Sequence, residues 1–150
     1  MKLEDFDKSK FSTTPFQVRV EKPWGHEIIY TPADAPACGK ILSVKAGKRL
    51  SLQYHDKKIE TLCLIKGKGT ITLSGLDGEK KEIAMELEKG YFVVPGQIHR
   101  VKAVTDMVFI ESSTPETGNT YRLEDDSKRE TETEEERNKT RGWKNNRIKN

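Results

Sequence analysis

The sequence predicts an all-β fold, an antiparallel sandwich or small barrel, and three observations support this prediction. Short segments of strand-forming residues recur from residue 16 to residue 124. Turns rich in Gly, Pro or charged residues separate these segments. No part of the region shows the long amphipathic pattern of a surface helix. Many short strands joined by tight turns are typical of two packed antiparallel sheets or a closed barrel.

Each expected strand ends at a recognisable turn. In chain order, the turns include PWG, PADAPACG, AGK, DKKI, GKG, GLDG, EKG, PGQIH and PETGN. The segment KEIAMELEKG also has helical propensity, but its short length and terminal glycine favour a strand. The expected strands are residues 16–20, 26–30, 40–46, 49–55, 61–67, 69–75, 81–87, 91–96, 99–105, 107–113 and 120–124.

The chain divides into three parts by composition. Residues 1–15 are polar and are expected to form a flexible N-terminal arm, and residues 16–124 form the barrel. Residues 125–150 are highly charged, with Trp143 and Ile148 almost their only apolar side chains. Such a segment buries too little apolar surface to offset its conformational entropy, so a disordered tail or a frayed helix is expected. A basic arm for nucleic acid is the functional alternative to a solvated tail.

Composition also narrows the class of protein. The net charge of +3 is mixed along the chain of 150 residues, which does not by itself favour a nucleic-acid partner. The sequence contains no run of eighteen apolar residues, and the N-terminus MKLEDFDKSK has no apolar stretch typical of a secretory signal. Cys38 and Cys63 form no CxxC pair, and two free thiols predict a reducing, cytoplasmic location.

Four polar residues are expected to meet inside the barrel. Gln53 and His55 are two positions apart in one strand and therefore share a face. The tight turn DKKI lets Glu60 return on the next strand, and the turn PGQIH delivers His99 to the same interior.

Two imidazoles, a carboxylate and an amide oxygen suit one divalent metal ion. Zinc is the first choice, and manganese, iron, cobalt and nickel are alternatives. The competing interpretation is that His55 and His99 are ordinary histidines at the surface or core edge. The chain has three histidines, and two of them fall in these two motifs.

Several stretches resemble the cupin superfamily. GKRLSLQYHDKKIETLCLIKG resembles the first cupin motif, and GYFVVPGQIHRV resembles the second with a gap shorter by two residues. RVEKPWGHEIIY, GKRLSLQYH and NTYRLEDDSKR are similar to segments of type II phosphomannose isomerase domains. In the last segment Ser127 and Lys128 replace the aromatic–glycine pair that is usual in that family.

This resemblance implies a cupin double-stranded β-helix, a small antiparallel barrel or jelly roll. It also implies a metal-dependent isomerase that interconverts mannose 6-phosphate and fructose 6-phosphate. A phosphate needs positive partners, and the candidates for substrate binding are Arg49, Lys58, Arg100 and Arg122. The candidates for catalysis are Arg49, Glu111 and Arg122. Sugar-nucleotide pyrophosphorylase domains are often fused to such domains, but these 150 residues contain no glycine-rich nucleotidyltransferase loop, so we do not expect that activity from them.

Alternation along the strands orients these candidates. If residues 49–55 form a regular strand, Arg49 shares the inward face of Gln53 and His55. Arg100 follows His99 directly and should point outward. Glu111 is expected to face the interior, either as a general base or paired with Arg49 or Arg122.

Two other functions remain open at this stage. One is a non-catalytic cupin that binds a metal and a sugar or sugar nucleotide, and the other is an iron-dependent dioxygenase. A small-molecule sugar phosphate is the expected partner, with no membrane or nucleic acid. The cupin resemblance also implies a homodimer, since cupin barrels often pair through edge strands or exchanged arms, which protects the sheet edges, and the arm before Phe16 could serve this way.

Overall fold

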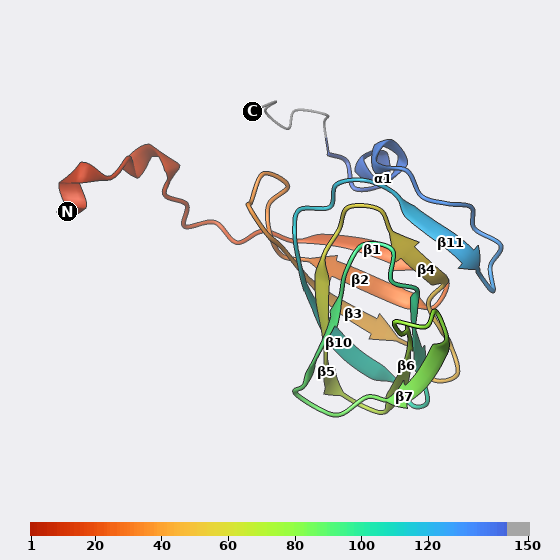
Figure 1. Ribbon diagram of the computed structural model, residues 1–150. Helices are drawn as coiled ribbons and strands as arrows, with labels where there is room; N and C mark the ends of the chain where they lie inside the picture. The colour runs from red at the N-terminus through yellow and green to blue at the C-terminus, as the bar shows by residue number, and fades with distance from the viewer. Residues whose placement is uncertain (144–150) are drawn as a thin grey trace.

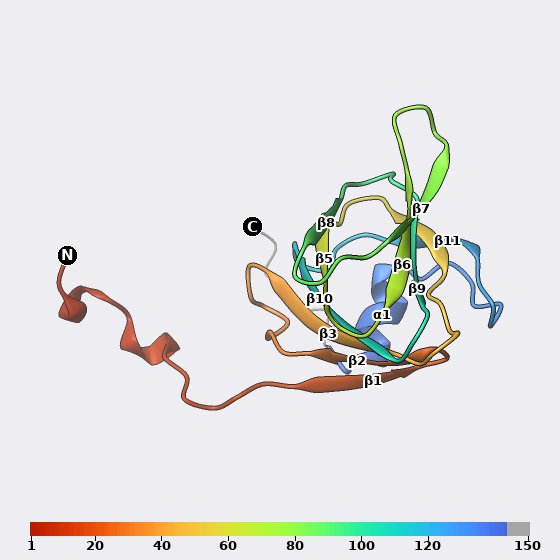
Figure 2. The same cartoon turned by 90° about the horizontal axis from the view of Figure 1, so that it is seen from below.

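The structure, a computed structural model, describes residues 1–143 and consists mainly of two packed antiparallel sheets (Figures 1 and 2). The six-stranded sheet has the order β1-β2-β3-β10-β5-β8, and the five-stranded sheet has the order β11-β4-β9-β6-β7. Every expected strand overlaps one of these strands, which confirms the all-β fold. The strands are β1 (Val18–Lys22), β2 (Gly25–Ile29), β3 (Cys38–Val44), β4 (Leu52–His55), β5 (Glu60–Lys66), β6 (Gly69–Ser74), β7 (Lys80–Ala84), β8 (Gly90–Val93), β9 (His99–Ala103), β10 (Met107–Ser113) and β11 (Thr120–Glu124).

The apolar core lies between the two sheets. Along β10 the side chains alternate, so that Met107 and Phe109 are buried while Val108 and Ile110 are partly exposed. Phe109 pairs in register with Leu42 of β3 and Leu64 of β5, and both of these side chains are buried in the same cluster. The centre of the six-stranded sheet therefore presents a continuous apolar row to the opposite sheet.

The same alternation makes the other end of the interior polar. Beyond Phe109 the next inward residue of β10 is Glu111, which pairs in register with Lys40 of β3. The first residue of β5, Glu60, is also buried. Charged side chains therefore continue the inward rows of the core, and this end of the barrel holds the candidate site.

Composition suggests a disordered tail or a frayed helix for residues 125–150, and residues 125–143 include a short helix that packs on the barrel. Glu132 forms a backbone bridge to Thr120, and α1 (Glu134–Thr140) begins at a capping box between Thr133 and Glu136. Arg137 is almost fully buried against the barrel. Ion pairs between arginines of this segment and glutamates of the barrel hold it in place. The low apolar content of the segment did not predict these ion pairs. The remaining part of the expected tail, 144–150, lies outside the described residues.

The N-terminal arm leaves the barrel at β1 and projects away from it (Figures 1 and 2). Residues 1–15 are exposed throughout, including two short 3-10 turns, η1 (Leu3–Asp5) and η2 (Lys8–Lys10). Among the described residues, no helix is long and apolar enough to cross a bilayer.

Removing the central aromatic side chain should test the packing of the two sheets. Phe109 is 0% exposed, so Phe109→Ala should lower the free energy of unfolding by about 3 to 5 kcal/mol, measured by urea titration. Leu76→Ala is the control, because Leu76 is fully exposed in the β6–β7 hairpin and its loss should change little. Equal effects of the two substitutions would contradict this assignment of the core.

Candidate metal centre and its charged pocket

Three buried side chains converge where β4, β5 and β9 meet. His55 ends β4, Glu60 begins β5 and His99 begins β9. One ligand atom from each residue lies within 4.8 Å of the others. Glu60 Oε1 is 3.0 Å from His99 Nε2 and 3.4 Å from His55 Nε2. Two neutral imidazoles and one carboxylate form a donor set that suits a borderline divalent cation.

The outer nitrogen of each imidazole has its own partner. His99 Nδ1 is 2.9 Å from the backbone carbonyl of Gln97, which can only accept, so this nitrogen carries the proton. His99 Nε2 is left facing Glu60, the position from which it would ligate an ion. His55 Nδ1 is 3.0 Å from Thr120 Oγ1. Such outer hydrogen bonds orient metal-binding imidazoles in proteins, so the cluster fits the expected ion.

Gln53 lies beside the cluster as the strand pairing dictates. It is the register partner of His99, and its Nε2 is 3.5 Å from His99 Nε2. Ser51 donates to Gln53 Oε1 at 2.6 Å. Rotating the Gln53 amide group by 180° would exchange the positions of Oε1 and Nε2. Ser51 Oγ would then accept a hydrogen bond from Gln53 Nε2. That rotamer presents the amide oxygen to an ion, and the role of Gln53 as a ligand stays a prediction.

The electrostatic environment keeps these groups in the ionisation states that a metal needs. Burial, together with the nearby Lys58 ammonium, lowers the pKa of His55 to about 4. Burial alone would raise the pKa of Glu60, but Lys58 and the hydrogen bonds from His55 and His99 outweigh it. The pKa of Glu60 is therefore held well below its ordinary value. At neutral pH the cluster offers a neutral His55 and an ionised Glu60.

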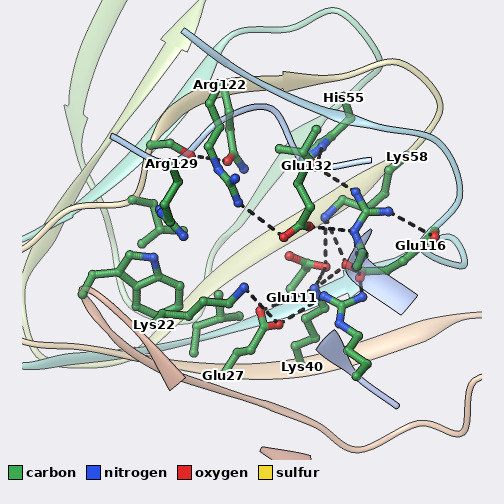
Figure 3. A pocket seen from close by; sticks show the side chains of 18 residues that line it. Lys22, Glu27, Lys40, His55, Lys58, Glu111, Glu116, Arg122, Arg129 and Glu132 are labelled. Carbon is green, nitrogen blue, oxygen red and sulfur yellow. Dashed lines mark hydrogen bonds and ion pairs between the residues drawn. The ribbon is translucent and has the colours of Figure 1, made fainter. Parts of the chain in front are cut away.

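A pocket lined by charged side chains adjoins this cluster (Figure 3). His55 and Gln53 belong to its lining. Lys58 joins the two parts, because its Nζ is 2.7 Å from Glu60 Oε2 and 3.3 Å from Glu111 Oε2. The free volume is about 70 Å³.

Cations outnumber acids around this pocket. Seven cationic side chains line the pocket, and six carboxylates pair with them. The net charge of the set is therefore +1, and a bound divalent ion would raise it to +3. The cations are Lys22, Lys40, Lys58, Arg122, Arg129, Arg137 and Arg141. The carboxylates are Glu27, Glu60, Glu111, Glu116, Asp125 and Glu132. A buried surplus of positive charge favours an anionic ligand.

Three of the predicted substrate and catalytic residues lie in the pocket. Lys58 and Glu111 face each other, and Glu111 also lies 3.7 Å from Lys40 Nζ, so its partners are lysines and not the expected arginines. Arg122 on β11 donates to Glu130 O and contacts Glu132. The Nε of Arg122 is buried and has no hydrogen-bond partner among the described residues, which marks a donor available to a ligand.

The expectation that Arg49 points into the interior is wrong. β4 begins only at Leu52, so the regular alternation assumed for residues 49–55 does not reach Arg49. Its guanidinium binds Asp126 at 2.8 Å in a separate surface hollow beside Trp24. Arg100 points away from His99, as expected. It is nevertheless buried, with its Nε donating to Leu50 O and its Nη1 to Glu124.

Sequence reasoning missed several charged residues of the pocket. Glu27 and Lys40 occupy inward positions of predicted strands, and a charged residue at such a position is a signal that could have been used. Burial tends to raise the pKa of Glu27, but Lys40, Lys22 and Arg141 leave it lowered. Arg141 contacts both Glu27 and Glu116 from the segment after α1, and no pattern in the sequence indicated this.

Thr120 links α1 to the metal cluster. Arg137 Nη2 of α1 donates to Thr120 Oγ1 at 3.2 Å, and the same oxygen contacts His55 Nδ1. Arg137 Nη1 also donates to the carbonyls of Glu116 and Gly118. The C-terminal segment thus supports the orientation of a candidate ligand.

The family model of the mannose-6-phosphate isomerase C-terminal domain matches residues 10–132, most of the chain. The chain belongs to this family. The match covers the cluster, the pocket strands and the first part of the C-terminal segment, and it ends before α1. No curated protein matches.

Solved structures of similar fold are cupin proteins. The capsular polysaccharide assembling protein CapF from Staphylococcus aureus superposes with a TM-score of 0.57 at 18% identity, over 85% of this chain and 33% of its own. A mutant of Bacillus subtilis oxalate decarboxylase gives a TM-score of 0.64 at 16% identity, over 76% of this chain and 33% of its own. The chain thus spans about a third of these proteins, and the likeness establishes the cupin fold.

Loss of the carboxylate should weaken metal binding strongly without unfolding the barrel. We expect Glu60→Gln to weaken zinc affinity by about 100-fold or more, because the only acidic donor of the cluster becomes neutral. Isothermal titration of metal-free protein measures this change. Lys58 keeps Glu111 and Glu116 as partners in this variant. The control is Glu79→Gln in the exposed β6–β7 hairpin; wild-type affinity in Glu60→Gln would refute the site.

The buried imidazole should make metal-free protein sensitive to mild acid. The pKa of His55 is about 4 in the folded chain and about 6.5 when exposed, so the unfolded chain binds the proton first as pH falls. The free energy of unfolding should therefore fall by roughly 2 kcal/mol between pH 6.5 and 4.5. Glu60 adds little to this fall, because the pKa of its exposed form is 4.5 and most of its contribution is lost below pH 4.5.

Urea titrations across this pH range, with metal removed by chelator, measure the slope. His55→Gln should flatten it, whereas His26→Gln, outside the cluster on β2, should keep it. An unchanged slope in His55→Gln would exclude His55 as its origin.

Proposed function

We propose that this chain is a metal-dependent isomerase of a sugar phosphate, of the mannose 6-phosphate to fructose 6-phosphate type. The main support is that a His/Glu/His cluster adjoins a buried pocket with surplus positive charge. Membership of the isomerase C-terminal family supports the same reaction class.

The metal would be held by His55, Glu60 and His99, with Gln53 as a fourth ligand. Zinc is our first choice among the divalent ions. When bound, the ion supplies Lewis-acid stabilisation of negative charge that develops on substrate oxygen. The cytoplasm is the proposed location, since Cys38 and Cys63 are free thiols.

The cationic side of the pocket would hold the phosphate. Arg122 offers its unpaired Nε, and Lys22, at the end of β1, lies across the pocket from it (Figure 3). Arg129 forms an ion pair with Asp125 and lines the same pocket. An arginine fork with a fixed geometry is well suited to phosphate oxygens.

Glu111 is our choice for proton transfer between C1 and C2 of the sugar. Its carboxylate is buried, and Glu111 lines both the charged pocket and the small cavity beside Glu60 and His99. Lys40 and Lys58 flank it and would stabilise the ionised form between transfers. The isomerisation requires one group that removes a proton from one carbon and returns it to the neighbouring carbon.

Binding without turnover is the second candidate, and two observations favour it. A free volume of about 70 Å³ holds only a few water molecules and does not enclose a hexose phosphate. Glu111, the proposed base, is engaged by two lysines. An iron-dependent dioxygenase remains a prediction from the sequence with no specific structural support.

The isomerase proposal predicts turnover that depends on both metal and base. Zinc-loaded protein should convert mannose 6-phosphate to fructose 6-phosphate in a coupled assay. Glu60→Ala should abolish the activity, and Glu111→Gln should lower kcat by about 100-fold or more. Arg19→Ala is the control, because Arg19 is exposed on β1 and should keep wild-type rates.

The two candidate functions give different outcomes. No turnover with zinc, manganese, iron, cobalt or nickel would exclude the isomerase. If sugar phosphates still raise the melting temperature of that protein, binding without catalysis is the function.

A further inference from the structure

Helix α1 and the residues that follow it cover one end of the barrel (Figures 1 and 2). The seven residues of α1, EEERNKT, include no apolar side chain. Two arginines of this segment, Arg137 and Arg141, are nevertheless only 5% and 7% exposed, and both line the charged pocket. Trp143 packs against a small apolar cluster of β1, β2 and β3. The segment is therefore docked on the barrel with its arginines directed inward.

These two arginines pair with buried carboxylates. Arg141 Nη2 is 3.1 Å from Glu27 Oε1, and Arg141 Nη1 contacts Glu116. Arg137 Nε is 2.9 Å from Glu132 Oε1 and 3.8 Å from Glu116 Oε2. Glu27 and Glu116 are only 4% and 2% exposed, so their charges need cations and not water as partners. The segment supplies part of the positive charge that balances this end of the barrel.

Without these two arginines the charge balance of the pocket would reverse. Seven cations and six carboxylates give a net charge of +1. Removing Arg137 and Arg141 leaves five cations with the same six carboxylates, a net charge of −1. The family match ends at residue 132, so both arginines lie beyond it while the other charged groups lie within it. The matched part of the chain alone therefore provides an acidic pocket.

The docked form has room for a small anion. The free volume of about 70 Å³ corresponds to roughly five water molecules at about 15 Å³ each, and a phosphate ion has five heavy atoms. Among the described residues, the buried Nε of Arg122 has no hydrogen-bond partner and can donate to such an ion. An oxyanion therefore fits while the C-terminal segment stays in place.

We propose that Arg137 and Arg141 make this pocket selective for an anion. With the segment docked, the pocket takes a tetrahedral oxyanion such as phosphate, and without the two arginines its net negative charge repels the same ion. The inference rests on the proposed phosphate-binding role of the pocket, and it adds two specificity-determining residues from beyond the matched domain. Because linkage is reciprocal, a bound anion also stabilises the docked position of α1.

Isothermal titration of inorganic phosphate into metal-free protein at low ionic strength tests the charge balance. Arg141→Gln lowers the net charge from +1 to 0 and should weaken phosphate binding by about 10-fold or more. Glu116→Gln raises the net charge to +2 and should tighten binding. The two changes together restore +1 and should return the affinity close to that of the wild type. Loss of the fold cannot produce the tighter binding expected of Glu116→Gln.

Lys139→Gln is the matched control. It removes one positive charge from the same helix, but Lys139 is 73% exposed and pairs with Glu135 outside the pocket. Its phosphate affinity should equal that of the wild type. Circular dichroism checks that each variant keeps the fold.

Amide hydrogen exchange of residues 134–141 in the wild-type chain measures the linkage directly. Phosphate should slow this exchange, because the anion and the docked segment stabilise each other. Faster exchange with phosphate would mean that the ligand displaces the segment, and it would overturn the inference.

The titrations separate this inference from the proposed function. If the wild type binds phosphate and Arg141→Gln binds it equally well, the selectivity role is overturned and the phosphate site stands. If the wild type binds no phosphate, the inference and the phosphate site of the proposed function are both overturned. Turnover of mannose 6-phosphate by zinc-loaded protein is measured separately and decides the isomerase proposal.

Discussion

The pairing of buried charges at one end of the barrel is the constraint on which the rest of the structure depends. Alternation along β3, β5 and β10 continues the apolar core directly into Lys40, Glu60 and Glu111. Charges inside a protein persist only where opposite charges and hydrogen bonds replace water. Each of these charged side chains therefore needs an oppositely charged neighbour from another strand or segment.

That requirement joins the candidate metal centre, the pocket and the C-terminal segment into one unit. Lys58 neutralises Glu60 on one side and Glu111 on the other. Arg137 contacts Glu132 and, through Thr120, the imidazole of His55. A change in the position of α1 would therefore alter both the pocket and the orientation of a ligand residue.

The two-residue alternation along the strands gives the two faces of the six-stranded sheet different chemical character. The inner positions provide the core and the charged site, while the outer positions form an apolar surface. Since adjacent residues point to opposite faces, the charged residues can concentrate inside without leaving charge on the outer face.

The sequence by itself determined the strands and the meeting of His55, Glu60 and His99, because these follow from local alternation and tight turns. It also placed Glu111 inside, by the parity of β10. Only the tertiary structure decided the partners of the charges. Arg49 pairs with Asp126 because β4 begins only at Leu52, and Arg137 and Arg141 reach the pocket from a segment whose composition suggested disorder or a frayed helix. Ion pairs between residues far apart in the chain leave no periodic signal, so they become visible only when the fold brings both partners together.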